Sequence, residues 1–134
     1  MLDFQNRVCY PLLVRKIDDH FISLAQREAQ KGEFRTKHGA LITRGKDILA
    51  GGYNRNIGID QILSRYGAYY SIHAELDAIR KMPYGFEDSC TLYSVRHNFR
   101  LARPCEKCLR VISRTGITRI VFTVEPGYVA EMFV

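Results

Sequence analysis

The sequence predicts an α/β fold in which helices cover the faces of a mixed β-sheet. The chain has 134 residues, of which 46% are hydrophobic and 25% charged, and this suits one globular domain with one core. In the second half, strand-like and helix-like hydrophobic patterns alternate along the chain. Such alternation is typical of parallel strands joined by helical crossovers. We therefore expect residues 1–134 to form a single domain of this class.

The first half of the chain predicts a helix followed by a hairpin. Residues 11–31 repeat apolar side chains at helical spacing, and Pro11 and Gly32 suit the two ends of a helix. Residues 38–53 contain two short apolar runs on either side of Arg-Gly-Lys-Asp. This pattern predicts a β-hairpin. Residues 54–70 are polar, aromatic and glycine-containing, which predicts a long loop, and loops of this length are often functional.

The second half predicts strands and helices in alternation. An apolar stripe favours a helix over residues 71–82, which Pro83 and Gly85 would end. The remaining elements are expected to be a strand at 90–96, a loop at 97–103, a helix at 105–114, a strand at 117–124 and a short terminal helix or strand at 128–134.

The composition of the chain indicates where the protein is located and what kind of partner it binds. No apolar run approaches the roughly 18 residues that span a bilayer, and the first residues lack a signal-peptide pattern. We expect a cytoplasmic protein (host cytoplasm if it is viral) with no membrane partner. The net charge is +6, and arginine outnumbers lysine by 14 to 6. This excess suits a nucleotide, nucleic acid or phosphate partner, although a basic solvated surface would give the same totals.

Two of the four cysteines, Cys105 and Cys108, lie on one turn at the expected start of the third helix. The positive end of a helix dipole favours thiolate over thiol, and thiolates bind Zn²⁺. Two cysteines do not complete a zinc site, and a redox dithiol has the same spacing. In a reducing compartment both readings are open.

A second helix start supplies the groups that two cysteines lack. His73 can provide a nitrogen ligand, and Glu75, two residues further on, points elsewhere on the turn. Three protein ligands leave a fourth position for water, which is the arrangement of catalytic zinc. A carboxylate beside that position can carry protons to a substrate.

His-Ala-Glu followed by Pro-Cys-x-x-Cys resembles the zinc-dependent cytidine and deoxycytidylate deaminase superfamily, over about residues 37–124. The resemblance implies a three-layer α/β/α sandwich with a mixed sheet. It implies that Zn²⁺ is held by His73, Cys105 and Cys108 and activates water for attack on C4 of a cytosine. Glu75 would protonate N3 and the leaving ammonia.

The same resemblance implies two substrate contacts. Asn54 matches the asparagine that holds the sugar in many members, although a plain turn residue would look the same. The backbone of Ala74 would contact the edge of the base.

Two departures from the familiar pattern bear on the substrate. After Gly-Tyr-Asn this chain reads Arg-Asn-Ile-Gly rather than Gly and Pro, and a longer loop precedes the cysteines, as in small viral and eukaryotic deaminases. Arg96 and Arg103, at the two ends of that loop, and Arg55 after the turn are expected near the site, where arginine suits phosphate. Tyr70 is expected to stack on a base or line the pocket.

The resulting hypothesis is hydrolytic deamination of a cytosine deoxynucleotide: dCMP, with dCTP as a further candidate. One alternative is a polynucleotide deaminase acting on cytosine or adenosine in single strands. A second is a non-catalytic zinc-binding interaction domain, against which the intact Glu75 argues. Because members of this superfamily usually oligomerise, we also expect a homo-oligomer.

Overall fold

The structure, a computed structural model, describes residues 9–11, 16–56, 71–83 and 88–134. Its main feature is a six-stranded sheet with the order β1-β8-β7-β6-β2-β3, beside a two-stranded sheet of β4 and β5. The elements are β1 Cys9–Pro11, α1 Lys16–Ala29, β2 His38–Arg44, β3 Asp47–Tyr53, β4 Arg55–Asn56, β5 Ser71–Ile72, α3 Ala74–Lys81, β6 Cys90–Arg96, α4 Glu106–Ile112, β7 Ile117–Glu125 and β8 Tyr128–Phe133.

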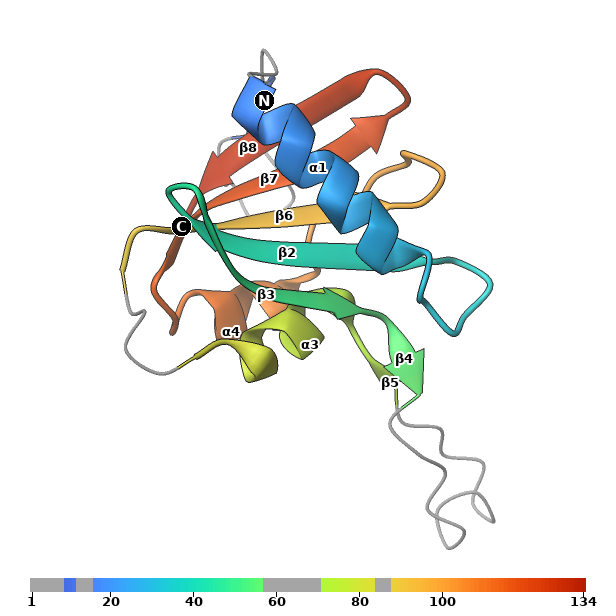
Figure 1. Cartoon of the computed structure of the whole chain (residues 1–134), viewed down its shortest axis with the longest axis horizontal. Coiled ribbons are helices and arrows are strands. Elements are labelled where there is room, and N and C mark those ends of the chain that lie inside the picture. Colours follow the sequence, from blue (N-terminus) through green and yellow to red (C-terminus); the bar gives the residue numbers. More distant parts are fainter. Residues whose placement is uncertain (1–8, 12–15, 57–70, 84–87) are drawn as a thin grey trace, which may run out of the picture.

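The six-stranded sheet is mixed and forms the middle layer of the molecule. Strands β6 and β7 are parallel, whereas the other neighbouring pairs are antiparallel. Helix α1 lies across one face of the sheet, and α3 and α4 cover the other (Figure 1). The predicted three-layer α/β/α sandwich is confirmed. Among the described residues, no helix is long and apolar enough to cross a membrane.

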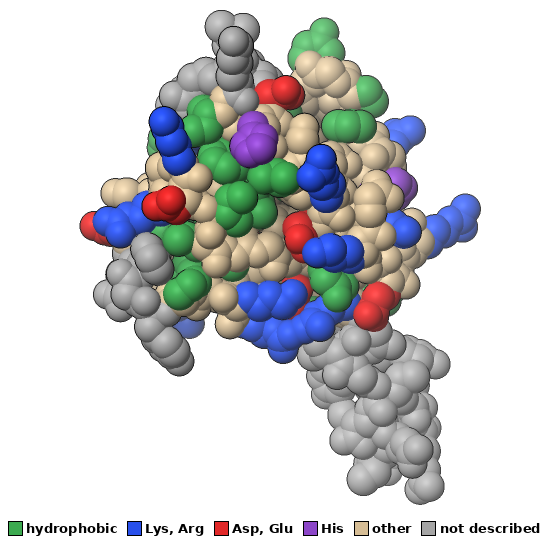
Figure 2. Space-filling view, viewed as in Figure 1, with side chains coloured by type: hydrophobic (Ala, Val, Ile, Leu, Met, Phe, Trp, Pro, Cys, Tyr) green, Lys and Arg blue, Asp and Glu red, His purple; other side chains and the backbone are tan. Residues whose placement is uncertain are grey.

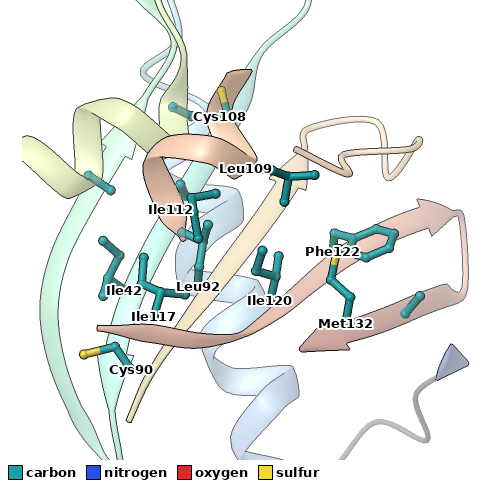
Figure 3. Close-up of a cluster of buried hydrophobic side chains, with 14 residues drawn as sticks. Ile42, Cys90, Leu92, Cys108, Leu109, Ile112, Ile117, Ile120, Phe122 and Met132 are labelled. Carbon is teal, nitrogen blue, oxygen red and sulfur yellow. The ribbon is translucent and has the colours of Figure 1, made fainter. Parts of the chain in front are cut away.

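The central strands are buried on both faces because successive side chains point in opposite directions. Leu41, Tyr93 and Val121 pack with α1 in one cluster. Their chain neighbours, among them Ile42, Leu92 and Ile120, pack with α3 and α4 in the other cluster. Figure 3 shows this second cluster, in which Cys108 of α4 lies among buried aliphatic side chains. Hydrophobic packing therefore fixes the helix that carries the Cys-x-x-Cys pair.

Three expected elements differ from the structure at their starts. Pro11 does not begin a helix but ends β1, which pairs with β8 at the edge of the sheet, where a proline is tolerated. Arg55–Asn56 and Ser71–Ile72 pair as two short strands, so the predicted loop begins later and the predicted helix at 71–82 begins only at Ala74. The chain end is a strand, β8, which is one of the two forms expected there. Residues 57–70, the rest of the predicted loop, lie outside the described residues.

Gly52 gives the first testable prediction. A Cβ atom at this position of β3 would collide with the Ala74 carbonyl oxygen and the Ala78 nitrogen, both backbone atoms of α3. Gly52→Ala should therefore lower the free energy of unfolding by about 3 kcal/mol, as overpacking against rigid backbone does. Urea denaturation measures the loss.

The neighbouring glycine is the matched control. A Cβ on Gly51 would lie 2.9 Å from Cδ of Glu28, the movable end of a side chain. Gly51→Ala should cost far less than Gly52→Ala. Equal stabilities of the two variants would contradict the close approach of α3 to β3.

Candidate active site

The first part of the site is the N-terminus of α3. His73 caps the helix with extended backbone angles (φ −70°, ψ 152°), and its carbonyl oxygen accepts a hydrogen bond from the Asp77 amide at 2.9 Å. Ala74 and Ala78 are fully buried, and their small side chains let the helix lie close to the sheet. This packing places Glu75 inside the molecule while His73 stays exposed at the helix end.

The second part is the N-terminus of α4. Cys105 caps this helix (φ −69°, ψ 167°), and its carbonyl oxygen accepts the Leu109 amide at 2.9 Å. Cys105 is exposed, whereas Cys108, one turn later, is buried. Leu109 and Ile112 are the buried residues that hold the helix on the sheet.

The two helix starts bring together a histidine and two cysteines. Nδ1 of His73 lies 3.2 Å from Sγ of Cys108 and 3.8 Å from Sγ of Cys105, and all three ligand atoms lie within 4.8 Å of one another. A tetrahedral zinc ion holds such ligand atoms about 3.5–3.8 Å apart. The group therefore fits one zinc ion, and the nitrogen beside both sulfurs favours a metal site over a redox dithiol.

The surroundings of Cys108 disfavour its thiolate form unless a cation lies beside it. Burial raises the pKa of the Cys108 thiol well above its usual range, and the nearby Glu75 carboxylate and Cys105 raise it further. A divalent cation reverses this balance because it stabilises thiolates directly. His73, Cys105 and Cys108 are thus positioned to hold zinc, as the sequence predicts.

Glu75 lies beside this group, and 1% of its surface is exposed. Its Oε1 atom lies 3.1 Å from Oγ of Ser94 and 3.2 Å from Nε2 of His38. Its Oε2 atom is also buried but has no hydrogen-bond partner among the described residues. Burial lowers the pKa of His38, an effect that the Glu75 charge opposes and the nearby Arg96 and His73 reinforce.

A cavity of about 510 Å³ opens above these groups, a size within the usual range for small-molecule sites. Residues of the two helix starts contribute to its wall, and three arginines do so as well. The residues that line it are Phe34, Arg35, Thr36, His38, Asn54, Ile72, His73, Glu75, Arg96, Arg103 and Cys105. One cavity thus joins the zinc group, a buried carboxylate and three guanidinium groups.

The residues expected to bind substrate fall into different places. Arg96 and Arg103 line the cavity. Arg55 does not line it within the described chain, because its Nε donates to Oδ1 of the buried Asp77 at 3.0 Å. Tyr70 lies outside the described residues.

Asn54 lines the cavity, and Ala74 lies in the chain between His73 and Glu75, which also line it. The Asn54 side chain accepts the His38 amide at 2.9 Å and donates to the Thr36 carbonyl oxygen at 2.7 Å. An amide has further hydrogen-bonding capacity, so its sugar contact stays a prediction. Ala74 is the buried first residue of α3, and its predicted contact with a base likewise stays a prediction.

Sequence reasoning missed two contributors. Arg35 reaches the cavity from the segment between α1 and β2, and nothing in the pattern of that short polar segment marks it. Ser94 contacts Glu75, and its signal was available: it is a polar residue inside the apolar run of β6. Buried polar side chains of this kind usually have specific partners.

Comparison with known proteins identifies the family. Residues 15–124 match the family described as the cytidine and deoxycytidylate deaminase zinc-binding region. The match covers most of the chain, and the chain belongs to this family. No curated protein sequence matches the chain closely enough to count as a relative.

Solved structures agree with the fold. The dCMP deaminase of cyanophage S-TIM5 in apo form superposes with a TM-score of 0.64 at 22% identity, covering 86% of this chain and 88% of that one. The same enzyme in complex with dCMP and dUMP gives 0.62 at 22% identity, with 83% of each chain covered. Cytidine deaminase from Burkholderia pseudomallei gives 0.65 at 20% identity, covering 86% and 91%. These likenesses confirm the α/β architecture.

Proposed function

We propose that this chain is a zinc-dependent hydrolase that deaminates dCMP to dUMP and releases ammonia, with dCTP as a second candidate substrate. The observation that carries the proposal is the shared cavity: Arg35, Arg96 and Arg103 line the same space as the zinc group and Glu75. A substrate with a reactive base and an anionic tail suits such a space. The similar fold of a phage enzyme solved with dCMP and dUMP supports this choice.

The arginines support a phosphate group in particular. Arginine binds phosphate through charge-assisted hydrogen bonds from a planar fork of donors. Nε of Arg96 is buried without a hydrogen-bond partner among the described residues. A buried donor without a partner costs free energy, so Arg96 has donor capacity that the described residues do not use.

In the proposed reaction, the metal and the protein have separate roles. Zinc bound by His73, Cys105 and Cys108 would supply Lewis-acid activation of water. Glu75 would act on protons alone: its free Oε2 takes a proton from water and delivers protons to N3 and to the departing amino group. The C4–N bond breaks and a C4–O bond forms, so cytosine and water become uracil and ammonia.

Two other functions are considered, and the activity assay described below separates them from the proposed one. A polynucleotide deaminase would need a track for the phosphate backbone. On the face shown in Figure 2, Lys and Arg side chains gather at the lower centre, but elsewhere neutral and acidic side chains separate them. A non-catalytic zinc domain would have no use for a buried carboxylate with one free oxygen beside the metal group.

Ammonia release separates these functions. Zinc-loaded protein is incubated with dCMP, dCTP, deoxycytidine, cytidine and a single-stranded oligonucleotide, and kcat/KM is measured for each. The proposal expects dCMP to be the best or second-best substrate, and both nucleosides to be much poorer. Preference for the oligonucleotide would favour the polynucleotide function. If no substrate released ammonia, the chain would be a non-catalytic zinc-binding domain.

Arg35 provides a matched test of the phosphate contact. It is exposed, so Arg35→Gln should leave the fold intact. Loss of a charge-assisted hydrogen bond worth about 1.5–3 kcal/mol corresponds to a rise in KM for dCMP of roughly 10- to 100-fold. KM for deoxycytidine, which has no phosphate, should not change.

The control is Arg114→Gln, which removes an exposed arginine that does not line the cavity. Its KM for dCMP should stay at the wild-type value. Equal effects of Arg35→Gln on nucleotide and nucleoside would rule out a phosphate contact at this residue.

We further propose a homo-oligomer located in the cytoplasm. Large apolar side chains are exposed near the sheet edge, among them Tyr128 (66%) and Phe133 (57%), and contact between copies would bury such groups. Light scattering should give a mass above the 15.5 kDa of one chain. A monomer under active conditions would contradict the oligomer.

A further inference from the structure

The two carboxylate oxygens of Glu75 have different surroundings. Oε1 is in contact with Ser94 and His38, at 3.1 and 3.2 Å. Oε2 has no partner among the described residues, although it is buried. One oxygen is therefore held by two polar side chains, while the other has no such partner among the described residues. This asymmetry is what a proton carrier requires, because an unheld carboxylate would rotate.

A count of hydrogens identifies the group that holds Oε1. The Ser94 hydroxyl lies 2.7 Å from the Ala102 carbonyl oxygen, its shortest contact with an obligate acceptor, and it has one hydrogen to give. When that hydrogen goes to Ala102, Ser94 cannot also donate to Glu75. Nε2 of His38 lies 2.7 Å from Oγ of Ser94 and 3.2 Å from Oε1 of Glu75. A hydrogen on Nε2 satisfies both oxygens at once.

The other tautomer does not satisfy these groups. With its hydrogen on Nδ1, His38 would direct a lone pair at the carboxylate, and one hydroxyl hydrogen would have to serve both Ala102 and Glu75. The contacts thus assign the hydrogen to Nε2, so that His38 donates and Glu75 accepts.

His38 is itself held in place through its backbone. Its amide donates to Oδ1 of Asn54 at 2.9 Å, and its carbonyl oxygen accepts the Asn54 amide at 3.2 Å. It is the first residue of β2, where it pairs with Arg96 of β6. A ring attached to such an anchored strand end can fix a carboxylate that projects from a different element, α3.

We propose that His38 is a positioning residue for Glu75: its Nε2–H holds Oε1 and leaves Oε2 directed at the reacting groups. Ser94 completes the arrangement by accepting from the same ring. The inference rests on the proposed deaminase function, because it assigns the group that orients the proton carrier of that reaction. It gives His38 no contact with sugar or phosphate.

Two substitutions separate positioning from substrate binding. His38→Met fills much of the space without a donor and should lower kcat for dCMP roughly 10- to 100-fold, as loss of an orienting partner does. KM should stay within about twofold, because binding in the ground state is unaffected. His38→Gln, whose amide can donate to Oε1, should recover most of kcat. His20→Met, an exposed histidine of α1, is the control and should match the wild type.

A double variant tests whether His38 acts through Glu75. In the Glu75→Gln background, adding His38→Met should reduce the residual turnover no further, because the group that it positions has already lost its function. Additive losses, a rise in KM with unchanged kcat, or failure of His38→Gln to recover activity would each overturn the inference.

A spectroscopic measurement tests the contact without any substrate. In long-range ¹H–¹⁵N spectra of the zinc-loaded protein, His38 should show a protonated Nε2 and an unprotonated Nδ1, and Glu75→Gln should shift the Nε2 resonance. An Nδ1–H tautomer would overturn the inference. Wild-type protein that shows the expected tautomer yet releases no ammonia from any substrate would overturn the proposed function instead.

Discussion

Glu75→Gln should retain its zinc and its fold while turnover of dCMP falls by at least roughly 10²–10⁴-fold, the usual effect of a lost general acid and base. The amide keeps the size of the side chain and can still accept at Oε1 from His38, so the surrounding contacts survive. It cannot take up a proton at the position of Oε2. Because one carboxylate would serve several proton transfers in each cycle, the loss can exceed this range.

The measurements for this variant are ammonia release, zinc content and the dissociation constant for dCMP. Binding should persist or tighten, because a neutral amide repels a phosphate less than a carboxylate does. The fold-loss should be the same for dCMP and dCTP, since the chemistry at C4 is common to both. Glu28→Gln, a carboxylate on α1, is the control and should remain active. Loss of zinc would show that Glu75 is a ligand, and normal turnover would assign the proton transfer to another residue.

Cys105→Ser should abolish stable zinc binding and, with it, activity. Cys105 is exposed and caps α4 through its backbone, so the substitution removes a thiolate without opening a cavity in the core. A hydroxyl is a much poorer zinc ligand than a thiolate. Elemental analysis after dialysis against a mild chelator should give close to one zinc per wild-type chain and far less for the variant.

Cys90→Ser distinguishes the loss of a ligand from the loss of any thiol. Cys90 is buried at the start of β6, its sulfur donates to the Asp88 carbonyl oxygen at 3.4 Å, and it is not one of the three grouped ligand residues. This variant should be less stable but should keep its zinc. Full zinc retention by Cys105→Ser would contradict the assignment of the metal ligands.

Much of the architecture could be predicted from the sequence because its signals are local. The strand at 90–96 agrees with β6 at both ends, and the hairpin at 38–53 contains β2 and β3 with a turn at Gly45 (φ 60°). The pairing of His73 with the two cysteines followed from motif order alone. The strand and the hairpin depend on residues that are close together in the sequence. The metal group could be predicted because few kinds of site combine one histidine with two cysteines.

The remaining features depend on partners that are distant in the sequence. Pro11 lies in β1 because the last strand pairs with it, and no local pattern indicates a partner about 120 residues away. The ion pair of Arg55 with a buried aspartate on α3 was not expected from the sequence, and its phosphate contact stays a prediction. The contact of His38 with Glu75 appears only once β2 and α3 are placed against each other.

Zinc titration of metal-depleted protein tests the central claim most directly. Zinc is removed with a chelator, restored in measured fractions of an equivalent, and the rate of ammonia release from dCMP is followed in parallel. We predict that activity rises linearly with bound zinc and levels off at one ion per chain, and that Glu75→Gln binds the same one equivalent without turnover. Full activity in the metal-depleted protein, or no ammonia release at one bound equivalent, would contradict the account.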